Sequence, residues 1–264
     1  MSPSSVRRAV QYFAATQAPK DECSAAAAFL CEFSDLLQTV DETDSRLAFV
    51  GPHGDGGYWT FNPTYFSHVL SGGAGDNIDF EVTMDELGAH VVIFDPYVTA
   101  LPQNAPRIQW IQERLGEDDG TRKGVSLHEA LLAAGFRLDL RTLMKLDVES
   151  SEWDILDAEF ANLGQLIVEF HDMHRLRDDV FRARATRIFQ QLRENFEVVA
   201  IHPNNYRPPV IFDSWVVADT FEVTLVNRRL APRRDTPFAQ NLPDNSYEMQ
   251  SINDVLARVT PIGR

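Results

Sequence analysis

Four ionisable side chains lie at positions where they could carry out acid–base chemistry. Asp147 ends one short hydrophobic run and Glu149 follows it, while Glu169 and His171 lie at the end of the next run. If the two runs are neighbouring strands, these side chains face one crevice, where buried charges are costly unless they are solvated, paired or used. Carboxylates and an imidazole are common groups in general acid–base catalysis, so Asp147, Glu169 and His171 are the candidate catalytic residues.

The same four side chains are also compatible with a divalent metal ion. Carboxylate oxygens and an imidazole nitrogen together form a mixed O/N ligand set. Networks of hydrogen-bonded polar groups use such clusters as well, and this metal-free interpretation is the favoured one. The sequence therefore assigns no metal ligand.

A glycine-rich turn earlier in the chain is typical of a nucleoside-binding site. Gly72, Gly73 and Gly75 stand between a hydrophobic run and the stretch 77–87, which can form a helix whose N-terminal amides face a ligand. Asp95 ends the next predicted strand about twenty residues further on, where nucleotide-binding α/β proteins place an acid against the ribose hydroxyls. The combination of turn, spacing and acid predicts that a nucleoside binds here.

The kind of nucleoside depends on the third glycine of the dinucleotide fingerprint Gly-x-Gly-x-x-Gly. After Gly73 and Gly75, Ile78 stands where that third glycine would be. NAD is therefore disfavoured, and a nicotinamide-dependent oxidoreductase on a Rossmann-like sheet is kept as the alternative enzyme class.

The hydrophobic pattern predicts the parallel sheet that these residues need. Runs such as 91–94 and 166–168 are continuous, which is typical of strands buried on both faces. Phe221, Val223 and Leu225 instead alternate with polar residues, which predicts a last antiparallel or edge strand. The other predicted strands are 68–71, 90–95, 108–112, 142–147, 165–171 and 196–202.

Helical patterns lie between and before these strands. Ser126 and Glu129 form a capping box that opens a short helix, and Gly135 closes it. An amphipathic crossover helix is predicted from the spacing of Phe181, Ala185, Ile188 and Leu192. We therefore predict an N-terminal helical cap over 1–45, a doubly wound α/β domain over 46–229, and a C-terminal tail over 230–264 that packs on the domain.

Composition and charge restrict the partners. With 24 Lys and Arg against 39 Asp and Glu, the formal charge is -15, which disfavours a nucleic acid partner because phosphate binding relies on cationic residues. Cys23 and Cys31 are too far apart on a helix for a disulfide, which predicts a reducing, cytoplasmic location. No hydrophobic run is long enough for a membrane span. The Phe-rich N-terminal helices suit a homodimer face as well as an intramolecular lid.

Taken in order, several segments resemble the FkbM-like S-adenosylmethionine-dependent methyltransferases. They are Gly-Asp-Gly-Gly-Tyr at 54–58, Ser-Gly-Gly-Ala-Gly-Asp at 71–76, Phe-Glu at 80–81, Phe-Asp-Pro at 94–96, Lys-Leu-Asp-Val-Glu-Ser-Ser-Glu-Trp at 145–153 and Glu-Phe-His at 169–171. The resemblance covers about 47–227 and is greatest for relatives with an Asp-Gly-Gly-Tyr segment before the cofactor turn. The typical family form has glycine where this chain has Ser150.

The resemblance implies a Rossmann-like class I methyltransferase fold with a seven-stranded, mostly parallel sheet and helices on both faces. It also implies S-adenosyl-L-methionine as cofactor, with Gly73 and Gly75 of the Gly72–Gly75 turn at its methionine part and Asp95 at its ribose hydroxyls. Asp55 would lie near the cofactor or shape its loop, and adenine contacts are expected around Glu113. The predicted reaction is O-methylation of a hydroxyl on a small molecule or sugar.

A non-catalytic relative that binds the cofactor for assembly or ligand sensing is the second alternative. Five residues with cofactor or catalytic roles are present together, which argues against loss of the site. They are Gly73, Gly75, Asp95, Asp147 and Glu169.

Overall fold

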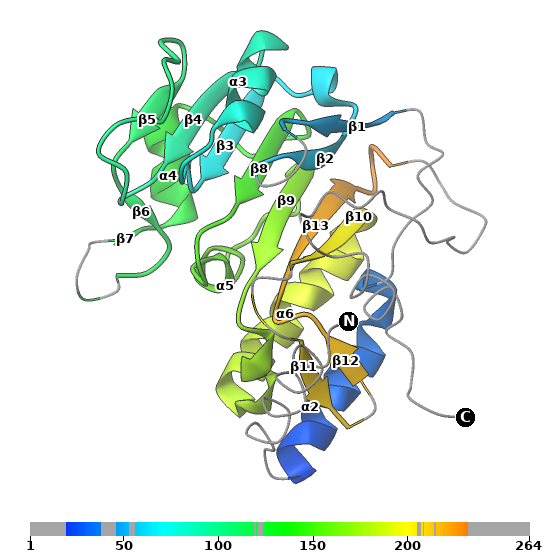
Figure 1. The fold of residues 1–264 in the computed structure, drawn as a ribbon. Coiled ribbons are helices and arrows are strands. Elements are labelled where there is room, and N and C mark those ends of the chain that lie inside the picture. The colour runs from blue at the N-terminus through cyan, green and yellow to red at the C-terminus, as the bar shows by residue number, and fades with distance from the viewer. Residues whose placement is uncertain are drawn as a thin grey trace, which may run out of the picture.

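A computed structural model describes residues 20–37, 46–52, 56–118, 120, 124–204, 207, 209–213 and 215–231 (Figure 1). Its centre is a seven-stranded sheet with the strand order β10-β13-β9-β8-β3-β4-β5. The strands are β3 (His68–Gly72), β4 (His90–Phe94), β5 (Gln109–Ile111), β8 (Thr142–Leu146), β9 (Gln165–Phe170), β10 (Phe196–Asn204) and β13 (Thr220–Asn227).

The strands run parallel except β13, which pairs antiparallel with both β9 and β10. The predicted Rossmann-like class I methyltransferase fold is therefore confirmed, and the predicted strands match the observed ones to within about two residues at most ends. The antiparallel direction of the last strand is also confirmed. The alternative of an edge position is not the one adopted, because β13 lies between β9 and β10.

The polar residues of β13 are explained by a hairpin that crosses one face of the sheet. The hairpin consists of β1 (Leu47–Val50) and β2 (Tyr58–Phe61). The Thr224 hydroxyl donates to the Trp59 carbonyl at 2.7 Å, and the Phe61 amide donates to Gln165 Oε1 at 3.0 Å. An interior strand can therefore carry polar side chains on this face, because the hairpin supplies partners for them.

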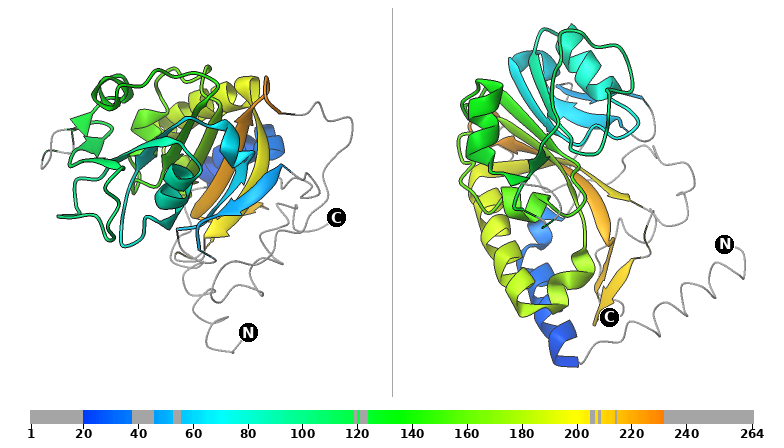
Figure 2. Two further views of the ribbon diagram at one scale, coloured as in Figure 1. Left: turned by 90° about the horizontal axis from the view of Figure 1, so that it is seen from above. Right: turned by 90° about the vertical axis from the view of Figure 1, so that its left-hand side faces the viewer.

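Helices cover both faces of the sheet (Figure 2). One face packs against α2 (Lys20–Glu32), α4 (Leu127–Ala134), α5 (Glu152–Ile155) and α6 (Asp179–Asn195). The other face packs against α3 (Asp79–Glu86) and the hairpin. The remaining elements are η1 (Ser34–Leu36), η2 (Pro63–Tyr65), η3 (Met173–Arg177), β6 (Arg114–Leu115), β7 (Gly124–Val125), β11 (Val210–Phe212) and β12 (Trp215–Val217).

The predicted helix signals are confirmed at α4 and α6. The Ser126 amide donates to Glu129 Oε2 at 2.8 Å and the Ser126 hydroxyl accepts from the Glu129 amide, which is the predicted capping box. Gly135 ends α4 with φ +70°, a backbone angle that favours glycine. The amphipathic face predicted for α6 is buried on the sheet.

The described part of the predicted N-terminal cap belongs to the main core. The rings of Phe29 and Phe33 lie 5.2 and 5.5 Å from the ring of Phe189 on α6. Most of the segments 1–45 and 230–264 lies outside the described residues, so these domain limits stay predictions. Across the described ranges, every helix is too short or too polar to cross a bilayer.

Candidate functional site

A cavity of about 780 Å³ opens at the carboxyl ends of the central strands, beside the hairpin. Six of the predicted site residues line it, namely Gly73, Gly75, Asp95, Asp147, Glu169 and His171. Gly72 is buried and is not among the lining residues, and an added Cβ there would meet Val148 Cγ1 at 2.7 Å. Asp55 lies outside the described residues. Around Glu113, where adenine contacts are expected, Arg114 and Leu115 line the cavity.

The glycine-rich turn passes directly over the end of β8. Gly73 has φ +86°, and a Cβ on it would lie 1.9 Å from the Asp147 carbonyl oxygen. Gly75 has φ +51°, and an added Cβ would have no atom within 4 Å. Gly73 is therefore required for the close approach to Asp147, while Gly75 leaves the backbone accessible to a ligand.

Asp95 holds the glycine-rich turn through its carboxylate. One oxygen accepts from the amides of Ala74 and Gly75 at 2.8 and 3.3 Å, and the other accepts from Tyr97 and Val98 at 2.7 and 3.1 Å. Burial raises the pKa of Asp95, but these four amides outweigh it and the pKa is lowered. Since a carboxylate has about four acceptor positions, a ribose hydroxyl would have to displace one amide.

Lys145 links the glycine-rich turn to α3. Its ammonium is buried, donates to the Gly73 carbonyl at 2.9 Å and lies 3.4 Å from Glu81 Oε1. The same Glu81 oxygen accepts from the Ser71 hydroxyl at 2.5 Å. Burial lowers the pKa of Lys145, but the negative charges of Glu81 and Asp147 raise it by a larger amount, so the pKa is raised overall. Lys145 is therefore a buried cation beneath the turn.

Asp147 has the protonation behaviour of a general base. Burial raises its pKa, Lys145 lowers it and Glu169 raises it again, so that the pKa is about 6. The Tyr58 hydroxyl donates to Asp147 Oδ2 at 3.3 Å, and the Lys145 ammonium lies 5.2 Å from the centre of the Tyr58 ring. A carboxyl with a pKa near the working pH can both accept and release a proton.

Glu169 is held in the ionised form beside Asp147. Burial raises its pKa, but hydrogen bonds from His171, Asp147 and Asn204 outweigh this and lower it. Its two oxygens contact His171 Nε2 at 3.1 Å and Asn204 Nδ2 at 2.6 Å. Of the two neighbouring carboxyls, Asp147 therefore carries the proton first.

His171 is an imidazolium at neutral pH. Burial lowers its pKa, but Glu152 and Glu169 raise it to about 11. Glu152 Oε1 accepts from the backbone amide of His171 at 2.7 Å and from its Nδ1 at 3.2 Å. At neutral pH His171 therefore offers no free nitrogen to accept a proton, and its contacts with Glu152 and Glu169 suit it to orienting these carboxylates.

The turn after β8 adopts a backbone conformation that favours glycine. Glu149 and Ser150 have φ +50° and +78°, and Ser150 is the position where the resembled family has glycine. The Ser150 hydroxyl donates to Asp172 Oδ2 at 2.8 Å, and Asp172 also binds Arg207 at 2.8 Å. Neither Ser150 nor Ser151 caps α5 with its side chain.

A row of polar side chains continues the site toward β10. In the strand register, His202 of β10 lies opposite Glu222 of β13, and Glu222 lies opposite Glu169 of β9. All three line the cavity together with Trp59 of the hairpin and Asn204. The cavity therefore has the glycine-rich turn at one end and this polar row at the other.

Comparisons with known proteins leave the activity undecided. No protein-family model matches the sequence, and a search of curated proteins found no match. A proposed S-adenosylmethionine-dependent methyltransferase from Listeria monocytogenes is 15% identical, with a TM-score of 0.38 over 63% of this chain and 92% of its own. For a TehB-like S-adenosylmethionine-dependent methyltransferase from Corynebacterium glutamicum, the identity is 14% and the TM-score 0.31, over 61% and 80%. The Methanococcus jannaschii fibrillarin pre-rRNA processing protein is 11% identical, with a TM-score of 0.35 over 72% and 87%. Similarities at these levels transfer no activity to the chain.

Proposed function

We propose that this protein is an S-adenosylmethionine-dependent methyltransferase of the FkbM-like kind, acting on a hydroxyl of a small molecule or sugar. One observation carries the proposal: the glycine-rich turn and the Asp147 carboxyl, whose pKa is about 6, line one cavity, and Gly73 lies against the backbone carbonyl of Asp147. A cofactor held by the turn would therefore present its reactive group beside a proton acceptor.

The cavity fits the cofactor in size and in backbone geometry. Its volume of about 780 Å³ lies within the range of small-molecule sites, roughly 300 to 1,000 Å³. Gly73 and Gly75 would hold the methionine part and Asp95 the ribose side, while Arg114 and Leu115 line the region next to β5. Bound S-adenosylmethionine supplies an activated methyl group on a cationic sulfonium, which suits a cavity lined by carboxylates.

The side chains around Asp147 would prepare an acceptor hydroxyl. Asp147 accepts the hydroxyl proton, and Tyr58 fixes the orientation of its carboxylate. The imidazolium of His171 holds Glu169 in place, and Glu169 and Asn204 then bind other polar groups of the acceptor. Orientation and proton removal are the two contributions that the protein makes to such a displacement.

We propose the acceptor class, the location and the oligomeric state from the composition of the chain. The acidic composition supports a small-molecule or sugar acceptor over a nucleic acid, and the two unpaired thiols support a cytoplasmic location. A homodimer through the Phe-rich N-terminal region is proposed on the same basis.

Calorimetric titration with S-adenosylhomocysteine and, separately, with NAD⁺ tests the function. We expect S-adenosylhomocysteine to bind and NAD⁺ not to bind. Asp147→Asn should leave this affinity within about threefold, while transfer to an identified acceptor should fall by about 10² or more. A folded chain that binds NAD⁺ and ignores S-adenosylhomocysteine would favour the oxidoreductase. Full biological activity of Asp147→Asn would favour the non-catalytic relative.

A further inference from the structure

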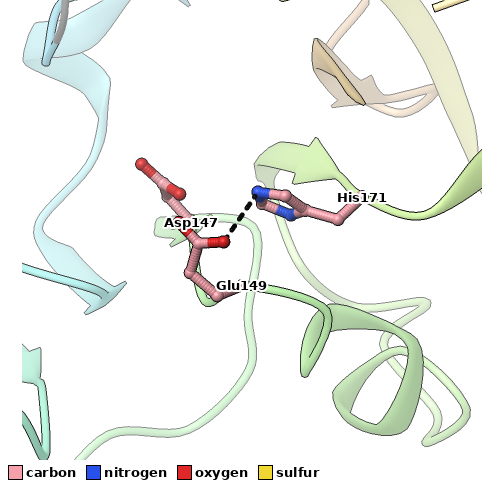
Figure 3. Close-up of side chains that lie close together, drawn as sticks. All are labelled: Asp147, Glu149 and His171. Carbon is pink, nitrogen blue, oxygen red and sulfur yellow. Dashed lines mark ion pairs between the residues drawn. The ribbon is translucent and has the colours of Figure 1, made fainter. Parts of the chain in front are cut away.

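Three side chains of types that bind metals, Asp147, Glu149 and His171, lie together after the ends of β8 and β9 (Figure 3). One ligand atom each from Asp147, Glu149 and His171 lies within 4.8 Å of the other two. His171 Nε2 is 3.7 Å from Glu149 Oε2 and 3.1 Å from Glu169 Oε2. Three carboxylates therefore surround one imidazole nitrogen, and all four residues line the cavity.

A residue outside this group aims the imidazole into it. Glu152 is fully buried and accepts from both the backbone amide and the Nδ1 of His171. Since Nδ1 is held by Glu152, the nitrogen that faces the acidic group is Nε2. Histidines that bind metals usually donate their other ring N–H to a carboxylate or a carbonyl in this way.

A metal ion between these ligand atoms would take the place of the proton on His171 Nε2, because an imidazole that binds a metal is neutral. Carboxylates of Asp147, Glu149 and Glu169 repel one another, and the lower dielectric of a cavity strengthens the repulsion. A proton on His171 Nε2 points toward only one oxygen. A divalent ion with bonds of about 2.2 Å joins ligand atoms up to about 4.4 Å apart, so ligand atoms separated by the full 4.8 Å would have to move closer when the ion binds.

We propose that Asp147, Glu149 and His171 bind one divalent first-row metal ion. Mixed imidazole and carboxylate ligands suit ions of this class, and Mn²⁺ is a convenient probe. Three protein ligands leave coordination positions open to the cavity, where a water or an acceptor hydroxyl can bind. The binding itself does not depend on the proposed methyl transfer.

Titration of the chelator-treated, full-length chain with Mn²⁺ tests the site, with free Mn²⁺ followed by electron paramagnetic resonance. We expect one ion per chain and a nitrogen coupling from His171 in the electron spin-echo spectrum. Glu149→Gln should weaken binding by about tenfold or more, and its 77% exposed side chain makes unfolding an improbable consequence. Glu159→Gln, which changes an exposed glutamate outside the cavity, should leave binding unchanged.

Two results would overturn the proposal. One is a wild-type chain that binds no Mn²⁺ or shows no nitrogen coupling. The other is a Glu149→Gln chain with wild-type affinity. The outcome is separable from the proposed function, because S-adenosylhomocysteine binding is measured in a different titration and either result can occur without the other.

Discussion

Asp147 and His171 lie in one cavity, and both pKa values are raised, but by different main causes. Burial raises the pKa of Asp147 to about 6, whereas Glu152 and Glu169 raise that of His171 to about 11 against the effect of burial. At neutral pH and without a bound metal, the carboxyl is the proton acceptor and the imidazole is a cation. The sequence identified both as candidates, but their roles depend on contacts with Glu152 and Lys145, whose parts in the site it did not reveal.

Asp95 provides a test at the residue scale. Asp95→Asn replaces an oxygen that accepts two amides by an NH₂ group, so we expect a loss of roughly 1 to 3 kcal/mol in the free energy of unfolding at pH 7. The folded pKa of Asp95 is lowered, so its ionised form stabilises the fold above the unfolded value of about 3.9. That contribution is lost as the pH falls through the folded pKa.

The measurement is urea unfolding of both chains between pH 8 and pH 3. The stability difference should stay constant down to about pH 5 and shrink only below about pH 4. A difference that already shrinks between pH 7 and pH 5 would contradict the lowered pKa.

At the scale of elements, local patterns predicted the strands and helices well. Continuous hydrophobic runs marked the parallel strands, and the Ser126 to Glu129 box marked the start of α4. The interior position of β13 was missed, because the hairpin that covers its polar face comes from more than 150 residues earlier, with Thr224 bound to Trp59 165 residues away. Alternation alone cannot distinguish an exposed face from a face covered by distant chain.

The turn after β8 gives a prediction about backbone strain. Ser150 has φ +78°, where a side chain costs about 1 kcal/mol relative to glycine. Ser150→Gly relieves this strain and loses the hydrogen bond to Asp172, so we expect stability within about 1 kcal/mol of wild type. Ser150→Ala keeps the strain and loses the same bond. Urea unfolding should therefore place glycine above alanine by about 1 kcal/mol, and equal stability would refute the role of the backbone angle.

The contact between β8 and α3 gives a second prediction at this scale. Lys145→Met leaves Glu81 buried without its cationic partner, which should cost roughly 3 to 5 kcal/mol in unfolding free energy. It should also weaken S-adenosylhomocysteine binding, because the Gly73 carbonyl loses its donor. Adding Glu81→Gln should recover part of the stability. Purely additive losses in chemical denaturation would show that the two residues are not coupled.

In the whole molecule, one face of the sheet forms most of the hydrophobic core and the other contributes side chains to the cavity. The face with α2, α4, α5 and α6 holds the largest hydrophobic cluster, while the hairpin and α3 face contributes Tyr58, Trp59 and Lys145 to the cavity. The described part of the N-terminal region packs on α6, and none of its residues lines the cavity. Several of the acidic residues behind the formal charge of -15 line the cavity at the strand ends, among them Asp95, Asp147 and Glu169.

Phe189 tests this division between the faces. Its ring contacts the rings of Phe29, Phe33, Phe170 and Trp153, so Phe189→Ala should cost roughly 3 to 5 kcal/mol in unfolding free energy. S-adenosylhomocysteine affinity, measured below the melting temperature, should change by less than about threefold. The matched control is Leu132→Ala, a change at a residue that is 67% exposed, which should stay within about 0.5 kcal/mol. A large loss of affinity in Phe189→Ala would contradict the separation.

The sequence by itself determined the order of strands and helices, the glycine-rich turn and the two strand ends that carry acids, because hydrophobic periodicity and turn chemistry are local properties. The tertiary structure alone decided which groups are charged and what each one holds. Tyr58 reaches Asp147 across 89 residues, and Glu152 reaches His171 across 19. Protonation states follow from burial and from such distant neighbours, and both are set only when the chain has folded.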